Sequence, residues 1–187
     1  MSDAPLARPK PCSTVQPPGE PLDPRRCVVL VPFASHISPP CACGLEELQR
    51  RGYQVRRIGG YSQIDYGRSQ IVSDALADPA DFQETFWIDA DIEFHPDAVE
   101  QLRAHRLPIS SAIYPRKGVR AIGSQPLPGM TQLTMGKGGG LVEILYAAAG
   151  FLLVRREVYQ AVHERLALPT CNEQFGTEKG TSLILGT

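Results

Sequence analysis

The chain has 187 residues, 42% of them hydrophobic, and a formal net charge of -1. This length suits one domain that buries its own core. The charge supplies no general basic field for nucleic acid or anionic lipid, so we expect no nucleic-acid partner. No apolar run approaches the roughly 20 residues that span a bilayer, so we expect no membrane span. The polar, proline-rich start lacks a signal-peptide core, which favours a cytoplasmic location.

The first 26 residues are rich in proline and have little apolar patterning. Such a composition is typical of a disordered tail, so we place the domain at residues 27–187. The five cysteines are an odd number and do not form a disulfide framework in a chain of this size. We interpret them as free thiols. A structural zinc site at Cys41 and Cys43 is the lesser alternative.

The domain begins with a predicted strand, a helix and a second strand. Residues 27–31 are apolar on both faces, as in a strand buried within a parallel sheet, and Pro32 is expected to end it. Leu45 and Leu48 have helical spacing, and Gly52 suits a helix cap. Residues 53–60 alternate as a strand does. This series predicts a βαβ unit with parallel pairing.

The same alternation continues along the chain. We expect a helix over 65–78, a strand over 86–91, a helix over 95–106 and a fourth strand ending at residues 114–115. Residues 141–155 read as two strands bent at Ala149 and Gly150, and a helix follows from about Arg156. The predicted fold class is α/β, with a mostly parallel sheet flanked by helices. In such sheets ligands bind at the carboxyl ends of the strands.

Two aspartates, Asp89 and Asp91, close the third predicted strand in "FWIDADIEF". On an extended segment, residues two apart point to the same side, so the two carboxylates should repel. A divalent cation such as Mg²⁺ or Mn²⁺ would relieve this repulsion, and it would also bind substrate phosphates. The alternative is structural, with the aspartates capping a helix or accepting backbone N–H groups in a turn.

The order of these motifs resembles a known family. "VVLVPF", "FWIDADIEFHPDAVEQL" and "AAGFLLVRREVYQAV" together are similar to glycosyltransferases of the GT-A fold, particularly the bacterial type-2-like enzymes and the related fungal mannosyltransferase group. The resemblance covers about residues 27–165. It implies a Rossmann-like nucleotide-sugar-binding domain that uses Mn²⁺ or Mg²⁺. The implied reaction moves a sugar from a UDP- or GDP-sugar to an acceptor that the resemblance does not identify.

The resemblance also implies roles for individual residues. Asp91 would bind the metal directly, and Asp89 would contact the metal or the ribose. The residues it assigns to the nucleotide-sugar are Pro32, Phe33, Arg57, Asp65, Arg68 and Asp89. Arginine is a natural bidentate partner of phosphate, which supports Arg68 and Arg57. A solvated surface residue is an equal alternative for Arg57.

An inverting transferase needs a carboxylate base for the acceptor hydroxyl. Glu173 and Glu178 are the only acids in the region where the family carries this base, and neither lies in a copy of the family's acidic motif. Without its tail the chain has about 160 residues, so we expect a domain that is minimal or truncated on the acceptor side.

Two other functions are compatible with the sequence. One is a nucleotide-sugar-binding domain without efficient transfer. The other is a phosphotransferase of the haloacid-dehalogenase type, which we disfavour because Asp91 is followed by "IEF" and the motif lies in the third strand. For Tyr114, Arg116 and Lys117, a surface turn is favoured over donor contact. Gly150 is expected to leave room for a sugar or an acceptor.

Overall fold

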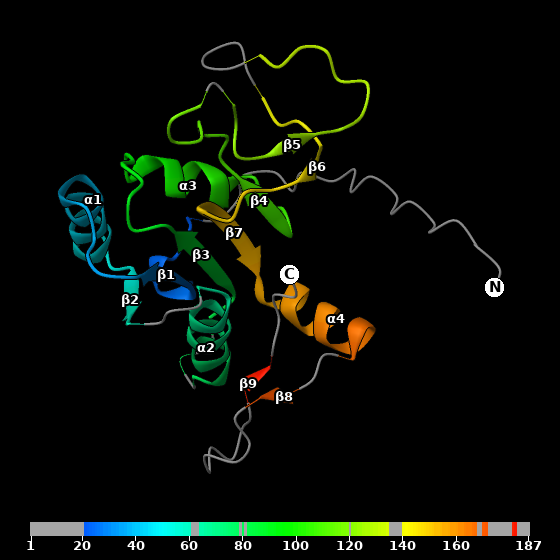
Figure 1. The fold of residues 1–187 in the computed structure, drawn as a ribbon. Coiled ribbons are helices and arrows are strands. Elements are labelled where there is room, and N and C mark those ends of the chain that lie inside the picture. Colours follow the sequence, from blue (N-terminus) through cyan, green and yellow to red (C-terminus); the bar gives the residue numbers. More distant parts are fainter. Residues whose placement is uncertain are drawn as a thin grey trace.

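A five-stranded sheet forms the centre of the computed structural model, which describes residues 21–60, 64–78, 80, 82–119, 121–134, 140–167, 170–171 and 181–182. The strand order is β2-β1-β3-β7-β4 (Figure 1). Its strands are β1 (Cys27–Phe33), β2 (Gln54–Gly59), β3 (Glu84–Ile88), β4 (Ile109–Ser111) and β7 (Phe151–Arg155). Short two-stranded pairs are formed by β5 (Gln125–Pro126) with β6 (Ile144–Tyr146) and by β8 (Thr170–Cys171) with β9 (Thr181–Ser182).

The direction of the strands confirms a mostly parallel sheet. β1 pairs in parallel with β2 on one side and with β3 on the other. β7 runs antiparallel to both β3 and β4, so β4 has the same direction as β1, β2 and β3. The sequence predicted β7 as a strand, and its reversed direction is a structural finding.

Helices cover both faces of the sheet, as predicted (Figure 1). They are α1 (Pro39–Arg50), α2 (Ile64–Ala77), α3 (Asp97–Ala104) and α4 (Arg156–Leu166), and a short 3-10 helix, η1 (Pro24–Arg26), precedes β1. Buried residues of α1 and α3 pack in one core cluster, whereas those of α2 and α4 pack in another. The sheet separates the two clusters. This mixed α/β architecture is compatible with a Rossmann-like fold.

The apolar run of β1 explains its place at the centre of both cores. Val29 and Val31 face the α1 side, whereas Val28 and Leu30 face the α2 side. All four side chains are fully buried. A strand covered on both faces needs apolar residues at successive positions, which is the pattern read from the sequence.

The expectation that Pro32 ends the first strand is wrong. β1 continues to Phe33, and Pro32 lies opposite Ile58 of β2. The pairing of β1 with β3 ends at Leu30, so Pro32 has only one neighbouring strand. A residue without a backbone N–H is tolerated where a strand lacks a neighbour on one side.

Arg103 of α3 joins several parts of the fold although it is only 2% exposed. Its guanidinium donates to Glu84 (2.6 Å), to the Tyr53 hydroxyl (2.9 Å) and to the Asp23 carbonyl (2.9 Å). The packed structure therefore includes residues 23–26, which the sequence analysis assigned to the tail. The predicted tail residues 1–20 lie outside the described residues. No described helix is long and apolar enough to cross a bilayer.

Candidate functional site

The sheet has a reversal of strand order at the carboxyl ends of β1 and β3. From β1 the chain leaves through α1 to β2 on one side, then returns through α2 to β3 on the other. Such a reversal splits the helical layers apart, and ligands of open α/β sheets bind in the resulting crevice. Asp89 and Asp91 directly follow β3, so they lie at this place.

The two aspartates lie in a turn and not on an extended strand, which corrects the premise used in the sequence analysis. β3 ends at Ile88, and the Ile92 N–H donates to the Asp89 carbonyl at 3.1 Å. Asp89 N–H donates to the Gly150 carbonyl of the neighbouring segment at 2.8 Å. The Ala90 carbonyl accepts from Ser38 N–H at 2.8 Å, at the start of α1. These bonds fix the backbone that presents both carboxylates.

Asp89 is paired with Arg68, a residue that the resemblance assigned to the nucleotide-sugar. Arg68 Nη2 lies 2.5 Å from Asp89 Oδ1, and the guanidinium lies over the Trp87 ring at 5.5 Å. Arg68 Nε is buried and has no hydrogen-bond partner among the described residues. Burial raises the pKa of the Asp89 carboxyl, with Asp91 adding to the rise and Arg68 opposing it. The Arg68 guanidinium, whose Nε donates no hydrogen bond within the described residues, therefore lies against an Asp89 carboxyl group that burial makes harder to ionise.

Asp91 has a different partner. Lys117 Nζ lies 2.6 Å from Asp91 Oδ2, and both side chains are largely exposed. The lysine belongs to the segment that follows β4, so the two residues are brought together only by the fold. The repulsion between the aspartates, for which a metal was the predicted relief, is thus reduced by two cations of the chain itself.

Tyr114 and Gly150 complete the site. Gly150 N–H donates to the Tyr114 hydroxyl at 2.8 Å. A Cβ at Gly150 would collide with this hydroxyl, and it would lie 2.7 Å from Asp89 Oδ2 and 2.9 Å from Ile92 Cδ1. The space beside Gly150 is therefore filled by the chain's own side chains, whereas a sugar or acceptor was the expected occupant.

The remaining predicted nucleotide-sugar residues do not contact the aspartate side chains. Phe33 packs its ring against Gly59, and Pro32 is buried at the end of β1. Arg57 donates to Gln49 of α1 at 2.9 Å. Asp65 is exposed in the first turn of α2. Glu173 and Glu178, the predicted bases, lie outside the described residues.

The charges of Arg57 and of both aspartates act on one buried thiol, that of Cys41. Burial raises the pKa of the Cys41 thiol to about 11, with the charges of Asp91 and Asp89 adding to the rise and that of Arg57 opposing it. The Cys41 thiol also lies 3.7 Å from the Asp89 carbonyl oxygen. Arg57 and both aspartates therefore act on the same buried thiol from the same end of the sheet.

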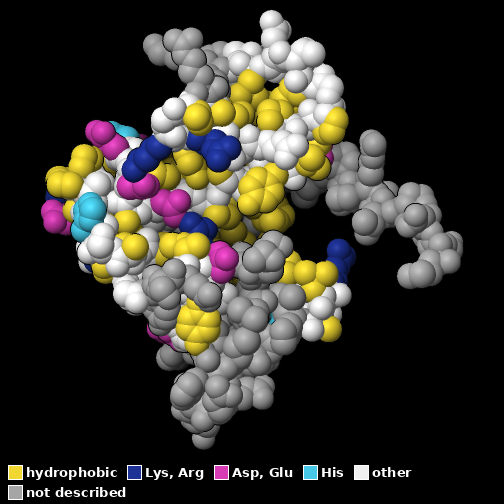
Figure 2. Space-filling model, viewed as in Figure 1, with side chains coloured by type: hydrophobic (Ala, Val, Ile, Leu, Met, Phe, Trp, Pro, Cys, Tyr) yellow, Lys and Arg dark blue, Asp and Glu magenta, His cyan; other side chains and the backbone are white. Residues whose placement is uncertain are grey.

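Sequence reasoning underestimated Tyr114 and Lys117, for which it favoured a surface turn. Both follow the fourth strand, whose carboxyl end meets the same edge of the sheet as Asp89 and Asp91. That shared edge was the available signal. Figure 2 shows the outcome: acidic and basic side chains gather on the region that Figure 1 places between α1 and the β5–β6 pair.

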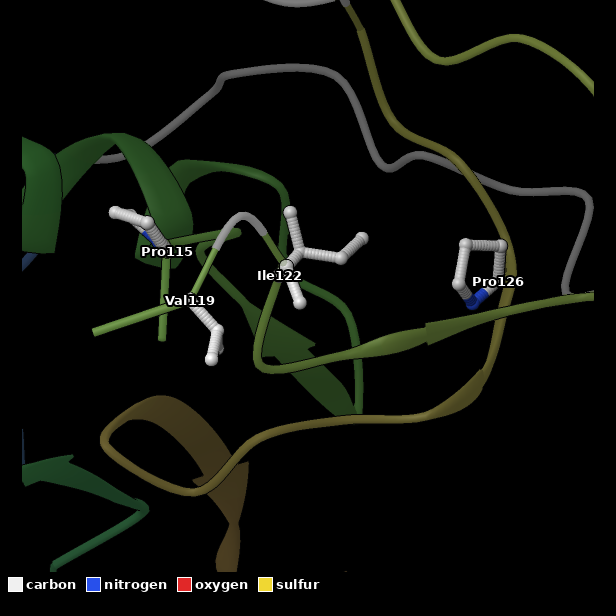
Figure 3. Close-up of a pocket in the computed structure, with 5 residues that line it drawn as sticks. Pro115, Val119, Ile122 and Pro126 are labelled. Carbon is white, nitrogen blue, oxygen red and sulfur yellow. The ribbon is translucent and has the colours of Figure 1, made fainter. Parts of the chain in front are cut away.

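An apolar hollow lies beside this charged region (Figure 3). It is wide and open, and its lining residues are Pro115, Val119, Ala121, Ile122 and Pro126. Two of these lining residues, Pro115 and Ile122, are joined by an isolated antiparallel β-bridge. Because Lys117 comes from the same short segment, the hollow and the aspartates are neighbours.

Asp89 and Asp91 are the residues of the site whose carboxylates could bind a magnesium or manganese ion. The described residues contain no group of three or more His, Cys, Asp or Glu that could enclose a metal. Mg²⁺ usually binds one or two carboxylates and completes its shell with phosphates and waters. Asp89 uses Oδ1 for Arg68, and Asp91 uses Oδ2 for Lys117. One oxygen of each carboxylate is thus left without a hydrogen bond to the described chain.

Comparison with known proteins supports the fold. No protein-family model and no curated protein matches the sequence. Among solved structures, the chain is similar to the crystal structure of A197 from STIV, with 18% identity and a TM-score of 0.55. The match covers 83% of this chain and 79% of that one. A likeness at this identity shows a shared α/β fold and nothing about activity.

Proposed function

We propose that the protein is a metal-dependent glycosyltransferase of the GT-A type, which takes its sugar from a nucleoside-diphosphate sugar. The observation that carries the proposal is the position of Asp89 and Asp91 on a fixed turn at the reversal of strand order, with Arg68 against them. Ligands with phosphate groups bind at such a place in related sheets. The Arg68 guanidinium beside Asp89 adds a positive charge that would attract a phosphate group.

In this proposal each residue has a definite task. Asp89 and Asp91 would hold Mn²⁺ or Mg²⁺, whose positive charge would assist departure of the nucleoside diphosphate. Arg68 orients Asp89 through its Nη2 and adds positive charge beside the diphosphate. The Tyr114 hydroxyl accepts from Gly150 N–H, which keeps the phenol ring beside the carboxylate. Pro32 and Phe33 lie at the end of β1, where the nucleotide base would rest.

Metal and nucleotide binding test the proposal directly. We expect Mn²⁺ to raise the melting temperature of the protein further when UDP, GDP or one of their sugars is present. Asp91→Asn should remove this combined effect, because the amide lacks the charge that binds the metal. The matched control is Glu93→Gln, an exposed acid two residues away. Absence of any Mn²⁺-dependent stabilisation by these nucleotides would contradict the proposal.

The second candidate is a domain that binds a nucleotide-sugar without efficient transfer. It is favoured by one observation. The cations that neutralise Asp89 and Asp91 belong to the chain, so the charges of the turn are balanced without a catalytic metal. Hydrolysis or transfer of the donor sugar by wild type and by Asp91→Ala separates the two functions. Equal inactivity of both proteins, together with retained nucleotide binding, would support the second candidate.

A phosphotransferase fits the geometry less well. In that chemistry the aspartates follow the first strand of the fold, whereas Asp89 and Asp91 here follow β3, the third strand in chain order. Turnover of a generic aryl phosphate by the wild-type protein would reverse this preference.

A further inference from the structure

The two aspartates of the site are neutralised in different ways. Arg68 belongs to α2 and its side chain is 11% exposed. Its guanidinium lies over the ring of Trp87 in β3. Lys117 is 78% exposed, and Asp91 is 55% exposed. A buried arginine held by a ring has little freedom to leave its partner. An exposed lysine has four flexible methylenes and a hydrated ammonium.

The strength of the two ion pairs differs accordingly. An exposed ion pair changes an equilibrium by no more than about fivefold, so a competing cation can displace Lys117 at little cost. In the other pair the Asp89 side chain is 36% exposed, but the Arg68 guanidinium is largely shielded from solvent and also contacts the Trp87 ring. One carboxylate of the site therefore has a fixed counter-ion, and the other has a replaceable one.

The backbone around Lys117 does not depend on its contact with Asp91. Arg116 N–H donates to the Ala121 carbonyl at 2.7 Å, and Pro115 bridges to Ile122. Gly118 has a φ of 74°, which lets the chain turn directly after the lysine. The ammonium can thus move away from Asp91 while the turn keeps its shape.

We propose that Lys117 is an exchangeable counter-ion, which neutralises Asp91 in the free protein and moves to the diphosphate of the donor when a divalent cation takes the carboxylate. The inference rests on the proposed function, because it assumes that metal and diphosphate meet at this turn. The ammonium and the metal cannot share Asp91 without repulsion. Once released, the ammonium offers three donors to phosphate oxygens and remains tethered within reach of them.

Two binding measurements with Lys117→Gln test this inference. The first is the affinity for Mn²⁺ alone, followed by the electron paramagnetic resonance of the free ion. We expect Lys117→Gln to bind Mn²⁺ two- to fivefold more tightly than wild type, since the competing cation is gone. The second is the affinity of the Mn²⁺-loaded protein for inorganic pyrophosphate, which we expect to fall at least threefold. Pyrophosphate is chosen because it requires no knowledge of the nucleotide base.

The matched control is Arg116→Gln, which removes the same charge from the neighbouring exposed residue. It should change neither affinity by more than the error of the measurement. Equal or weaker Mn²⁺ binding by Lys117→Gln, or unchanged pyrophosphate affinity, would overturn the inference. Failure of the proposed function looks different: wild type and Asp91→Asn would then bind Mn²⁺ equally poorly. Loss of the metal site in this way would overturn both proposals.

Discussion

Arg68 Nη2 lies 2.5 Å from Asp89 Oδ1, and this pair connects α2 to the turn that follows β3. Arg68 belongs to α2, the helix that precedes β3 in the chain, and Asp89 directly follows β3. The ion pair therefore joins the two segments that flank this strand. The same guanidinium covers the Trp87 ring within that strand. Arg68 is therefore placed to affect both the stability of the fold and the charge of the site.

Replacement of Arg68 by Gln should destabilise the protein. The substitution leaves the Asp89 carboxylate without its charged donor, and loss of such a bond costs about 1–3 kcal/mol when the remaining group is partly buried. Urea denaturation measures the change in the free energy of unfolding. Arg57→Gln serves as the control, because that exposed guanidinium contacts only the Gln49 amide and should change the free energy of unfolding by less than about 0.5 kcal/mol. Similar losses in both variants would contradict the role given to Arg68.

Gly150→Ala should destabilise the protein through steric overlap. The new methyl group would meet the Tyr114 hydroxyl and lie 2.7 Å from Asp89 Oδ2. Overpacking of this kind costs about 1–3 kcal/mol. Addition of Tyr114→Phe should restore part of this loss, because it removes the oxygen that collides with the methyl group.

A double-mutant cycle of these two substitutions measures their coupling. Gly140→Ala is the control, since no atom of the described residues lies within 4 Å of the position of its new Cβ. Additive effects of Gly150→Ala and Tyr114→Phe would show that the hydroxyl does not limit the space at Gly150.

Stability should fall in alkaline solution because two thiols are buried. Burial raises the pKa of Cys27 to about 12 and that of Cys41 to about 11. Both folded values lie above the unfolded value of about 8.5, so the contribution is complete below that pH. Above it the unfolded chain loses protons first, and each thiol removes roughly 2 kcal/mol of stability between pH 8 and pH 10.

Urea denaturation at pH 7.5 and pH 10 measures this loss. Cys41→Ala should show a smaller decrease between the two pH values than wild type, even though it is less stable at both. An identical decrease would assign the alkaline sensitivity to other groups. The exposed Cys43 should react with a thiol reagent well before Cys27 and Cys41 do.

Arg103→Leu should be among the more damaging substitutions outside the site. It leaves Glu84 without its cation and removes the donors of the Tyr53 hydroxyl and the Asp23 carbonyl. Breaking a buried ion pair costs about 3–5 kcal/mol. Thermal denaturation of Arg103→Leu and of Tyr53→Phe, which removes a single contact and should cost about 1 kcal/mol, tests this ranking.

The α/β order was predictable because hydrophobic periodicity records which faces an element buries. Val28 to Val31 are apolar at successive positions, and this indicated a strand covered on both sides. The same kind of run in β7 could not reveal its direction, because apolar residues read identically along a parallel and an antiparallel strand. The continuation of β1 through Pro32 depended on where β3 ends, which is not a local property of the sequence.

The candidate site was predictable only in part. Asp89 and Asp91 were located from their place after a buried strand, and Arg68 from its residue type in the preceding helix. The partnership of Lys117 with Asp91 required knowledge of how the segment after β4 returns to the sheet edge. Gly150 was expected to leave room for a sugar or an acceptor, whereas the tyrosine hydroxyl that fills part of this space comes from a distant part of the chain.

The pairing of Cys27 with Glu84 has a consequence for how the protein is made. β1 leaves the ribosome before its partner β3, which is synthesised only after two helices and another strand. Until then the backbone N–H and C=O groups along one edge of β1 have no partner strand, and closing so long a loop is slow. We therefore expect nascent chains that stop before β3 to bind chaperones, and longer ones that include β3 to be released from them.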